Sequence, residues 1–500
     1  MRILIASSEA VPFAKTGGLA DVAAALPQAI SRMGHEVWLA LPYYRANQPA
    51  ITKANYPIHR TGVEFDIEMG DKTVTGELYW SEIPNTNVTV LLIDQPEYFN
   101  RPQLYQENGH DYADNCERFA FFSRAVIEVC KKLILRPHIV HANDWQTALI
   151  PALLQTEYAY HPQFLRTRSV YTIHNLAYQG MFWHWDMELT GLDWKYFNWR
   201  QMEAYGQLNL MKTGIVFADA ITTVSPSYAK EIQTPSFGCG LEEVLATHHD
   251  KLSGILNGVD TRIWSPESDT HLEENYTAKT VKEGKAANKA ALQERLGLPQ
   301  KAETPLIGMI SRLAGQKGLD IITPILEEVI KRDVQLLFLG TGESKYEDHL
   351  KYLAQQHKDK IAAFIGFDEG LAHQIEAGVD LFLMPSAYEP CGLNQMYSML
   401  YGTPPIVHEI GGLADSVVDT TEASLKEGKA TGFSFKYYNT ESLYQTINRA
   451  LDLYEDKPSW DKLVQNCMKG DWSWTRSAKE YINIYQRLTH SPRETIPVLT

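Results

Sequence analysis

Short apolar runs rich in β-branched residues alternate with longer helical patterns along most of this chain. The first such run is Arg2–Ala6, and apolar residues at helical spacing follow over Asp21–Met33, before Gly34. A strand followed by a helix, repeated many times, is typical of a doubly wound parallel sheet. The pattern therefore predicts an α/β fold.

The alternation stops at a polar stretch, Ser265–Gly284, and then starts again. Strands expected before it are Glu36–Ala40, Val88–Ile93, Ile139–His141, Ser169–Thr172 and Ala220–Val224, and strands expected after it are Pro305–Ile310, Gln335–Leu339, Ile361–Ile365, Leu381–Met384 and Pro405–Val407. Glu64–Trp80 is expected to form a hairpin that need not join the parallel core. A length of 500 residues allows two or three domains. Two α/β halves are the simplest division, with residues 1–253 in the first and 254–476 in the second. The last helical pattern, in 477–500, could return to pack on the first half, but composition does not show this; the packing is implied only by the family resemblance described below.

A five-residue repeat supports two halves, because Gly17–Asp21 recurs as Gly411–Asp415. Each copy is expected to follow a strand and to begin a helix. A turn rich in glycine leaves backbone N–H groups open at a helix N-terminus, where an anion can approach closely. Lys15 adds a cation to the first copy. The alternative interpretation is a tight strand–helix turn without a ligand, and a dinucleotide fingerprint is excluded because no GxGxxG follows the first strand.

Charged residues follow two expected strands of the second half. Arg312 and Lys317 come after the strand that ends at Ile310. The carboxyl ends of parallel strands are where open α/β sheets bind ligands. A guanidinium fork and a mobile ammonium suit the oxygens of a diphosphate, and the alternative is a solvated basic loop. Glu389 follows the strand that ends at Met384 and is expected to accept sugar hydroxyls or, alternatively, to cap a helix.

Polar residues also end two expected strands of the first half. His174 and Asn175 follow one of them, and Asp144 and Trp145 follow the other. Trp145 is expected to offer a stacking face to a sugar. The alternatives are a structural histidine and a helix N-cap, which are common uses of these residue types. Cys391 is interpreted as a small packed residue and not as a nucleophile, because no basic residue adjoins it.

The charge balance and several missing motifs narrow the chemistry. With 46 basic and 61 acidic residues the formal charge is −15, which argues against a nucleic-acid surface. No Asp-x-Asp occurs, so a metal-chelating sugar-transferase site is not expected, and no HExxH, GxxxxGK[ST] or GxSxG occurs either. Five scattered cysteines without a CxxC indicate a reducing compartment, and no apolar run is long enough to cross a membrane. We expect a cytoplasmic protein without nucleic-acid or membrane partners.

Ten motifs in a fixed order give the chain a resemblance to bacterial and plant-type glycogen (starch) synthases of glycosyltransferase family 5. The motifs are Lys15–Asp21, His141–Trp145, Tyr171–Gly180, Ala218–Ile232, Gly254–Asp260, Ile310–Asp320, Leu339–Glu343, Glu389–Tyr397, Gly402–Val407 and Gly411–Val417. The resemblance implies the GT-B fold, in which two Rossmann-like domains face each other across a deep interdomain cleft. It covers the chain nearly from end to end.

The resemblance also implies a reaction. Glucose would be transferred from ADP-glucose to the non-reducing end of an α-1,4-glucan (glycogen, starch or a malto-oligosaccharide), with retention of anomeric configuration and without a metal or other cofactor. Retention without an evident covalent nucleophile favours same-face substitution, in which the departing diphosphate assists deprotonation of the acceptor hydroxyl. Two alternatives stay open: a GT-B transferase that uses UDP-glucose, and a non-catalytic glucan-binding or granule-scaffold paralogue. Association with glucan granules also stays open.

Residue roles follow from the same resemblance. Arg312 and Lys317 would neutralise the donor diphosphate, and Lys15 would reach its distal phosphate from the opposite domain. Glu389 would orient the glucose, and the carbonyl and ring of His174 would lie beside it. Further pocket-lining groups implied by the resemblance or by strand-end position are Gly17, Gly18, Asp21, Asp144, Trp145, Asn175, Asn257, Cys391, Gly392, Leu393, Gly411 and Gly412, the last two through their N–H groups.

The chain departs from the family pattern at two places. Relatives usually carry Arg and Thr before the second Gly-Gly, whereas this chain has His408, Glu409 and Ile410 there. Asn143 stands where His is common. The first departure puts in doubt any phosphate contact from side chains of that stretch, and either could alter donor affinity or acceptor preference.

Overall fold

The computed structural model describes residues 1–491 of the chain, which divide into two compact units. Unit 1 comprises Met1–Asn257 together with the segment that begins at Trp474, and unit 2 comprises Gly258–Ser473. The C-terminal segment of unit 1 forms helix α20 (Trp474–His490). Residues 492–500 of the expected terminal segment lie outside the described residues. Within residues 1–491, no helix combines the length and the apolar character needed to cross a bilayer.

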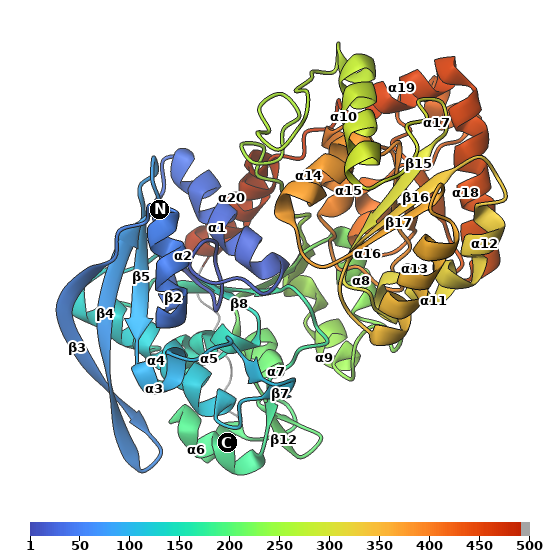
Figure 1. Cartoon of the computed structure of the whole chain (residues 1–500). Coiled ribbons are helices and arrows are strands. Elements are labelled where there is room, and N and C mark those ends of the chain that lie inside the picture. Colours follow the sequence, from blue (N-terminus) through green and yellow to red (C-terminus); the bar gives the residue numbers. More distant parts are fainter. Residues whose placement is uncertain (492–500) are drawn as a thin grey trace. The chain divides into compact units, whose positions relative to one another are not determined.

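Unit 1 is built on a nine-stranded sheet in the order β14-β13-β9-β8-β1-β2-β5-β4-β3 (Figure 1). The parallel strands are β1 (Arg2–Ala6), β2 (Glu36–Pro42), β5 (Val88–Asp94), β8 (Ile139–Asn143), β9 (Arg168–Ile173), β13 (Ala220–Thr223) and β14 (Leu252–Gly254). The expected hairpin is formed by β3 (His59–Met69) and β4 (Lys72–Glu82). It extends the sheet, since β4 pairs antiparallel with β5.

Helices cover the sheet of unit 1, and its core lies between them and the strands. The helices are α1 (Gly18–Arg32), α2 (Gln48–Lys53), α3 (Pro96–Phe99), α4 (Asn115–Lys132), α5 (Leu149–Gln155), α6 (Met187–Thr190), α7 (Leu210–Phe217), α8 (Pro226–Glu231), α9 (Glu242–Thr247) and α20. The C-terminal helix joins this core because Tyr481 and Tyr485 are fully buried against apolar residues of β1 and α1. The apolar face that α20 shows in sequence is thus buried within unit 1.

Unit 2 contains a six-stranded parallel sheet in the order β17-β16-β15-β18-β19-β20 (Figure 1). The strands are β15 (Leu306–Ile310), β16 (Gln335–Gly340), β17 (Ile361–Ile365), β18 (Leu381–Met384), β19 (Pro405–His408) and β20 (Phe433–Phe435). The helices are α10 (Val281–Arg295), α11 (Leu319–Ile322), α12 (Leu326–Val329), α13 (Ser344–Gln356), α14 (Glu369–Gly378), α15 (Asn394–Leu400), α16 (Gly411–Ser416), α17 (Glu422–Lys426), α18 (Thr440–Glu455) and α19 (Lys457–Cys467). Together the two units establish the α/β class with parallel sheets that the strand–helix alternation predicts.

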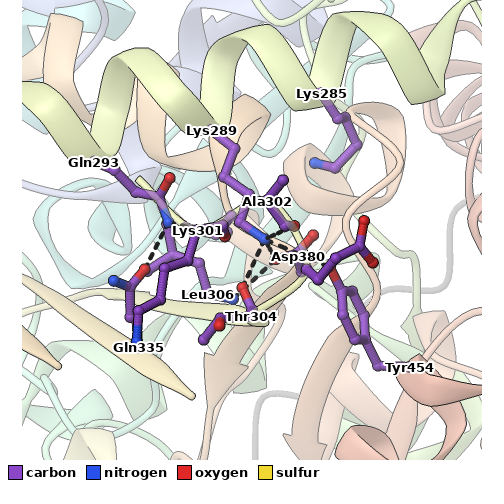
Figure 2. Close-up of polar contacts among 12 residues, drawn as sticks. Lys285, Lys289, Gln293, Lys301, Ala302, Thr304, Leu306, Gln335, Asp380 and Tyr454 are labelled. Atoms are coloured by element: carbon purple, nitrogen blue, oxygen red, sulfur yellow. Dashed lines mark hydrogen bonds and ion pairs between the residues drawn. The ribbon is translucent and has the colours of Figure 1, made fainter. Parts of the chain in front are cut away.

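A buried lysine ties α10 to the sheet of unit 2. The Nζ of Lys289 donates to the carbonyl oxygens of Ala302 and Thr304 and forms an ion pair of 2.7 Å with Asp380 (Figure 2). Asp380 also accepts the backbone N–H of Leu306 at the start of β15. Since a buried charge is tolerated only when it is paired and hydrogen-bonded, this network fixes the position of α10 relative to β15.

Candidate functional site

In both units the chain reverses its direction of winding beside the first strand of the sheet. In unit 1, β1 lies between β2 and β8, and in unit 2, β15 lies between β16 and β18. Successive strands are added on one side of that first strand and then on the other. Such switch points open a crevice at the carboxyl ends of the strands, where doubly wound sheets bind ligands. Asp144, Arg312 and Glu389 follow strands at these two points, and His174 follows the next strand of unit 1, β9.

The loop after β1 is held by a buried carboxylate that the sequence analysis did not single out. Glu9 is 3% exposed and accepts hydrogen bonds from the hydroxyls of Thr16 and Tyr105, each at 2.6 Å. Its other oxygen accepts the backbone N–H groups of Thr16 and Gly17. The signal in the sequence is an acid between an apolar strand and a glycine-rich loop. Glu9 fixes the backbone on which Lys15 and the paired glycines sit.

Beyond the Glu9 anchor, the loop is open. Lys15 is more than half exposed, and its Nζ lies 2.8 Å from a carboxylate oxygen of Asp21, one helical turn into α1. A Cβ atom placed on Gly17 or Gly18 would have no neighbour within 4 Å. Among residues 1–491, the N–H groups of Gly18 and Leu19 have no hydrogen-bond acceptor. A cation and two unused donors at the start of α1 are suited to an anion.

His174 carries a neutral ring whose tautomer is set by Asn143. The amide nitrogen of Asn143 donates to the carbonyl of Ala6 at 3.0 Å, so its oxygen faces the Nε2 of His174 at 2.9 Å. Nε2 must therefore carry the proton, and Nδ1 is left as an acceptor. Burial lowers the pKa of His174 to about 3, which keeps the ring uncharged at neutral pH. The ring can accept a hydroxyl proton in a hydrogen bond but cannot supply positive charge.

Asp144 and its neighbours complete the polar edge of unit 1. Asp144 adopts a left-handed φ of 54° at the end of β8, and its carboxylate accepts the N–H of His174 at 2.7 Å. Burial, helped by the charge of Glu9, raises the pKa of Asp144 to about 7. Asn175 turns its side chain onto the N–H of Ala177. The side-chain oxygen of Asn257 is buried and has no hydrogen-bond partner among the described residues.

Trp145 does not offer the open stacking face that its sequence position suggested. The indole is 8% exposed and packs edge-on against Phe119, with ring centroids 5.1 Å apart. Phe182 contacts it as well, and the backbone at Gly180 approaches so closely that a Cβ there would lie 2.5 Å from the indole. The expectation is corrected: other aromatic side chains cover the indole ring of Trp145, and this ring packs against the turn at Gly180.

In unit 2 the structure brings together charged residues from both sides of the switch point. Lys317, from the loop after β15, forms an ion pair of 2.6 Å with Glu389, from the loop after β18. The hydroxyl of Ser386 donates to the same carboxylate oxygen at 3.1 Å. Arg312 is exposed, and among the described residues it forms no ion pair, only a 3.4 Å contact with Gln316. This edge therefore holds one free guanidinium and one lysine shared with an acid.

The second Gly-Gly serves close packing and does not present the two N–H groups as expected. A Cβ on Gly411 would lie 2.1 Å from the carbonyl oxygen of Glu389, and one on Gly412 would lie 2.1 Å from that of Cys391. The N–H of Gly412 donates to the carbonyls of Glu389 and Pro390. These glycines let α16 support the backbone of the Glu389 loop, so the expected N–H contact from Gly412 to a ligand is corrected.

The turn after Glu389 offers other backbone donors. Gly392 has a φ of +71° and precedes α15, and the side chain of Gln395 binds the carbonyls of Cys391 and Gly392. The N–H groups of Gly392 and Leu393 have no acceptor among residues 1–491. Cys391 is buried, as its interpretation as a packed residue requires.

Phe367 is a second residue that was not singled out in the sequence. It follows β17 on the same strand-end edge and is 88% exposed, the highest value among the large apolar side chains of the described residues. A phenylalanine left in water at a ligand-binding edge is suited to stacking against a flat ring. The available signal was a lone aromatic directly after a strand and a glycine.

No group of three or more His, Cys, Asp or Glu side chains in residues 1–491 is arranged to hold a metal ion. Charged side chains at these edges include Lys15 and Asp21 in unit 1, and Arg312, Lys317 and Glu389 in unit 2.

Comparisons with known proteins agree with this geometry. A sequence profile described as the starch synthase catalytic domain matches residues 2–247, and one described as glycosyl transferases group 1 matches residues 293–466. The chain is 45% identical to a glycogen synthase of Rhodopirellula baltica, over 97% of this chain and 98% of that protein. A glycogen synthase of Anaeromyxobacter sp. is 46% identical over 98% and 99% of the two chains.

This chain belongs to the glycogen/starch synthase family. It is a glycosyltransferase that acts on a nucleotide sugar and a glucan. A solved structure described as the catalytic domain of starch synthase IV from Arabidopsis thaliana, bound to ADP and acarbose, matches with a TM-score of 0.89 and 33% identity over 98% of this chain and 99% of the other. Sucrose-phosphate synthase from Thermosynechococcus elongatus, at 16% identity and a TM-score of 0.59, shares the fold. The fold is the GT-B type.

The structure shows what the two departures from the family pattern do. Asn143 fills its position by joining the backbone of β1 to the ring of His174, as described above. His408 is buried, stacks on Phe435 with ring centroids 5.3 Å apart, and its Nδ1 lies 2.9 Å from the carbonyl oxygen of Ser386. His408 therefore supports the loop that carries Glu389. Glu409 is exposed.

Proposed function

We propose that this protein transfers glucose from ADP-glucose to the non-reducing end of an α-1,4-glucan, with retention of anomeric configuration. The observation that carries the proposal is the grouping of Arg312, Lys317 and Glu389 at the switch point of unit 2. Two cations match a diphosphate, and an acid beside them matches the hydroxyls of the attached sugar. The ADP in the starch synthase IV structure supports the choice of nucleotide.

The donor diphosphate is assigned to Arg312 and Lys317. Arg312 is exposed and can form a bidentate contact with phosphate oxygens. Lys317 keeps Glu389 as a partner at 2.6 Å while one or two of its three N–H donors turn to phosphate. Lys15 is assigned to the same phosphates by family resemblance, and its contact with Asp21 is surface-exposed and weak enough to exchange for a stronger anion. Phe367 is assigned to the nucleobase because its exposed ring lies at the edge that holds Arg312.

By family resemblance, the transferred glucose is assigned to Glu389 and to His174. Glu389 accepts sugar hydroxyls with the oxygen that Lys317 and Ser386 leave available. His174 accepts a hydrogen bond from a sugar hydroxyl at Nδ1, because its Nε2–H is committed to Asn143. Both groups orient the sugar without forming a bond to it, which is consistent with same-face substitution. In that reaction the C–O bond to the diphosphate breaks, the leaving phosphate oxygen takes the proton of the acceptor hydroxyl, and that hydroxyl oxygen bonds the anomeric carbon on the same face.

The charge of the leaving diphosphate is met by cations and backbone N–H groups in this proposal, with no metal or other cofactor required. Glycogen, starch and malto-oligosaccharides are all acceptors of suitable chemistry.

The five cysteines are free thiols, which supports a reducing compartment and a cytoplasmic location. A formal charge of −15 supports the expectation of neutral acceptors and of no nucleic-acid partner.

Donor competition tests the proposal. Equal concentrations of ADP-glucose and UDP-glucose are offered with maltotetraose, and released ADP, released UDP and chain growth are measured. We expect ADP release with matching chain growth. If UDP is the main nucleotide released, the donor is UDP-glucose and not ADP-glucose. If neither donor supports transfer, the protein is better explained as a non-catalytic glucan-binding protein.

Side-chain variants test the residue assignments in the same assay. Arg312→Ala and Lys317→Ala each remove a charge-assisted contact with the diphosphate, so kcat/KM for ADP-glucose should fall about a hundredfold. Lys429→Ala is the matched control, because Lys429 forms an exposed ion pair of 2.8 Å with Glu427 in the segment before β20 and does not follow the carboxyl end of a strand. Its kcat/KM should stay within twofold of the parent. If all three variants change kcat/KM by the same factor, the assignment of Arg312 and Lys317 to the donor site is wrong.

A further inference from the structure

Unit 1 exposes a group of tryptophans that the proposed reaction does not use. Within residues 183–199, Trp183 is 62% exposed, Trp185 51%, Trp194 40% and Trp199 70%. Tryptophan is among the most costly side chains to leave in water, and monomeric proteins rarely expose large apolar patches without a binding role. We call the group Trp183, His184, Trp185, Trp194, Phe197 and Trp199 the aromatic surface.

Five of these rings form a continuous path across the surface. Trp183 and Trp185 have centroids 6.4 Å apart, and Trp185 and Trp194 have centroids 5.4 Å apart. Trp194 then contacts Phe197 at 5.6 Å, and His184 lies between Trp183 and Trp185. The tryptophan and phenylalanine planes meet at 68° to 72°. Rings placed edge to face leave broad faces uncovered by one another, so an extended ligand can stack on several of them in turn.

The backbone below the aromatic surface is firmly held. Met187 is fully buried at the start of α6, and the C-terminal carbonyl of that helix, on Thr190, accepts the side chain of Arg124 at 2.7 Å. The buried Nζ of Lys212, on α7, donates to the carbonyls of Trp199 and Glu203. The aromatic rings are therefore exposed on an ordered frame and are not part of a loosely packed core. Preorganisation of this kind reduces the entropy cost of binding.

The charge around the rings selects the class of ligand. Residues 183–203 carry four acids (186, 188, 193 and 203) and two bases (195 and 200). A net negative surface disfavours nucleic acids and anionic lipids. Sugars are uncharged, their C–H faces stack on the electron-rich faces of indoles, and their hydroxyls bond to carboxylates such as Asp186 and Asp193 at the edge of the path.

We propose that the aromatic surface binds α-1,4-glucan chains outside the site of glucosyl transfer. Trp183 follows His174 by nine positions in the same unit, and Gly180 between them is packed against Trp145. A glucan held there is bound to the same unit as His174. A branched polymer that is held at a second surface presents its chain ends at a raised effective concentration. The inference rests on the proposed function for its choice of an α-glucan.

The double variant Trp183→Ala/Trp185→Ala tests the surface, with Tyr352→Ala as the matched control. Tyr352 is 56% exposed on α13 of unit 2, outside the aromatic surface. Retardation in gels containing glycogen measures binding without catalysis, and transfer from ADP-glucose is measured with maltotriose and with glycogen. Because two stacked rings are removed, we expect the glycogen concentration for half-maximal retardation and half-maximal rate to rise about tenfold in the double variant. Transfer to maltotriose and the behaviour of Tyr352→Ala should change less than twofold.

Three results would overturn the proposal. Unchanged retardation by glycogen would show that the rings do not bind glucan. A change from dimer to monomer by light scattering, with unchanged retardation, would assign the surface to a second copy of the chain. An equal loss with maltotriose and glycogen would place the rings within the transfer site itself. A fourth result separates the two proposals. If neither the parent nor the variants transfer glucose, but retardation by glycogen still depends on the tryptophans, the proposed reaction is wrong and the proposed glucan-binding surface is supported.

Discussion

At the scale of single residues, Gly18 and Gly412 occupy the same place in the repeated pentapeptide but differ in their surroundings. A Cβ on Gly18 would meet nothing within 4 Å, whereas one on Gly412 would lie 2.1 Å from the carbonyl oxygen of Cys391. The first glycine leaves space for a ligand, and the second allows two backbones to touch.

These surroundings predict opposite outcomes for the same substitution. Gly412→Ala should lower the free energy of unfolding by about 1–3 kcal/mol, because backbone must move to admit the methyl group. Gly18→Ala should leave stability unchanged or raise it by up to about 1 kcal/mol, and should reduce kcat/KM for ADP-glucose by obstructing the free N–H groups. Urea unfolding and steady-state kinetics measure both. Equal losses of stability in the two variants would contradict this explanation of the repeat.

Glu9 is predicted to act through the Lys15 loop. Glu9→Ala removes both carboxylate oxygens, so the N–H groups of Thr16 and Gly17 and the hydroxyl of Thr16 lose their acceptor. We expect kcat/KM for ADP-glucose to fall about tenfold, with the loss of one charged acceptor. In a background of Lys15→Ala the same change should have little further effect, since the loop then has no cation to position. Fully additive losses in the double variant would show that Glu9 and Lys15 act independently.

At the scale of elements, His141 joins β8 to β9 and to α20. Its Nδ1 lies 2.7 Å from the hydroxyl of Tyr485, and its Nε2 contacts the hydroxyl of Thr172. Burial lowers the pKa of His141 to about 3, from about 6.5 in the unfolded chain. As pH falls below 6.5 the unfolded chain binds this proton first, so the stability that depends on a neutral His141 is complete above pH 6.5 and is lost toward pH 3.

Comparing the parent with His141→Gln separates the contribution of His141 from those of two other buried groups. The lowered pKa of His174 also makes stability fall as pH falls, whereas the raised pKa of Asp144 makes stability rise as pH falls. The difference in unfolding free energy between parent and variant should shrink as pH falls from 6.5 to 4.5. The limiting slope is about 1.4 kcal/mol per pH unit. Urea unfolding at pH 7.5, 6.5, 5.5 and 4.5 measures it. A difference that is independent of pH would mean that His141 is not held neutral.

The attachment of α10 gives a second prediction at this scale. Lys289→Met removes the partner of Asp380 and leaves that carboxylate largely buried and unpaired. The free energy of unfolding of unit 2 should fall by about 3–5 kcal/mol. Exposed Lys282, on the same helix, provides the control variant Lys282→Met, which should change stability by less than about 0.5 kcal/mol. A loss below about 1 kcal/mol in Lys289→Met would show that the network contributes little to holding α10.

At the scale of the whole molecule, local patterns in the sequence predict most of the frame and part of the site. The bounds of β1 and β18 agree with the predicted strands, because both are short apolar runs between clear turn signals. The pairing of Lys317 with Glu389 joins residues 72 positions apart and depends on the order of strands in the sheet, which local patterns do not encode. The family resemblance assigned both residues to one donor, but not to one ion pair.

The features that the sequence did not reveal depend on neighbours in space. The crowding of Gly412 arises from Cys391, and the covering of Trp145 arises from Phe119 and Phe182. Glu9 carries no motif of its own, and only its hydrogen bonds with Thr16, Gly17 and Tyr105 show its role. These three cases share one cause, since a residue type and its spacing indicate what a side chain can do but not what already occupies it.

An NMR experiment tests whether the protein is an ADP-glucose-dependent, retaining α-1,4-glucan synthase. ADP-glucose labelled at the anomeric carbon of its glucose is incubated with maltotetraose and EDTA, and the product is followed by NMR. We predict one new α-1,4 linkage at the non-reducing end for each ADP released, at a rate that EDTA does not change. A β-linked product, addition at the reducing end, abolition of transfer by EDTA, or release of ADP without chain growth would contradict the account.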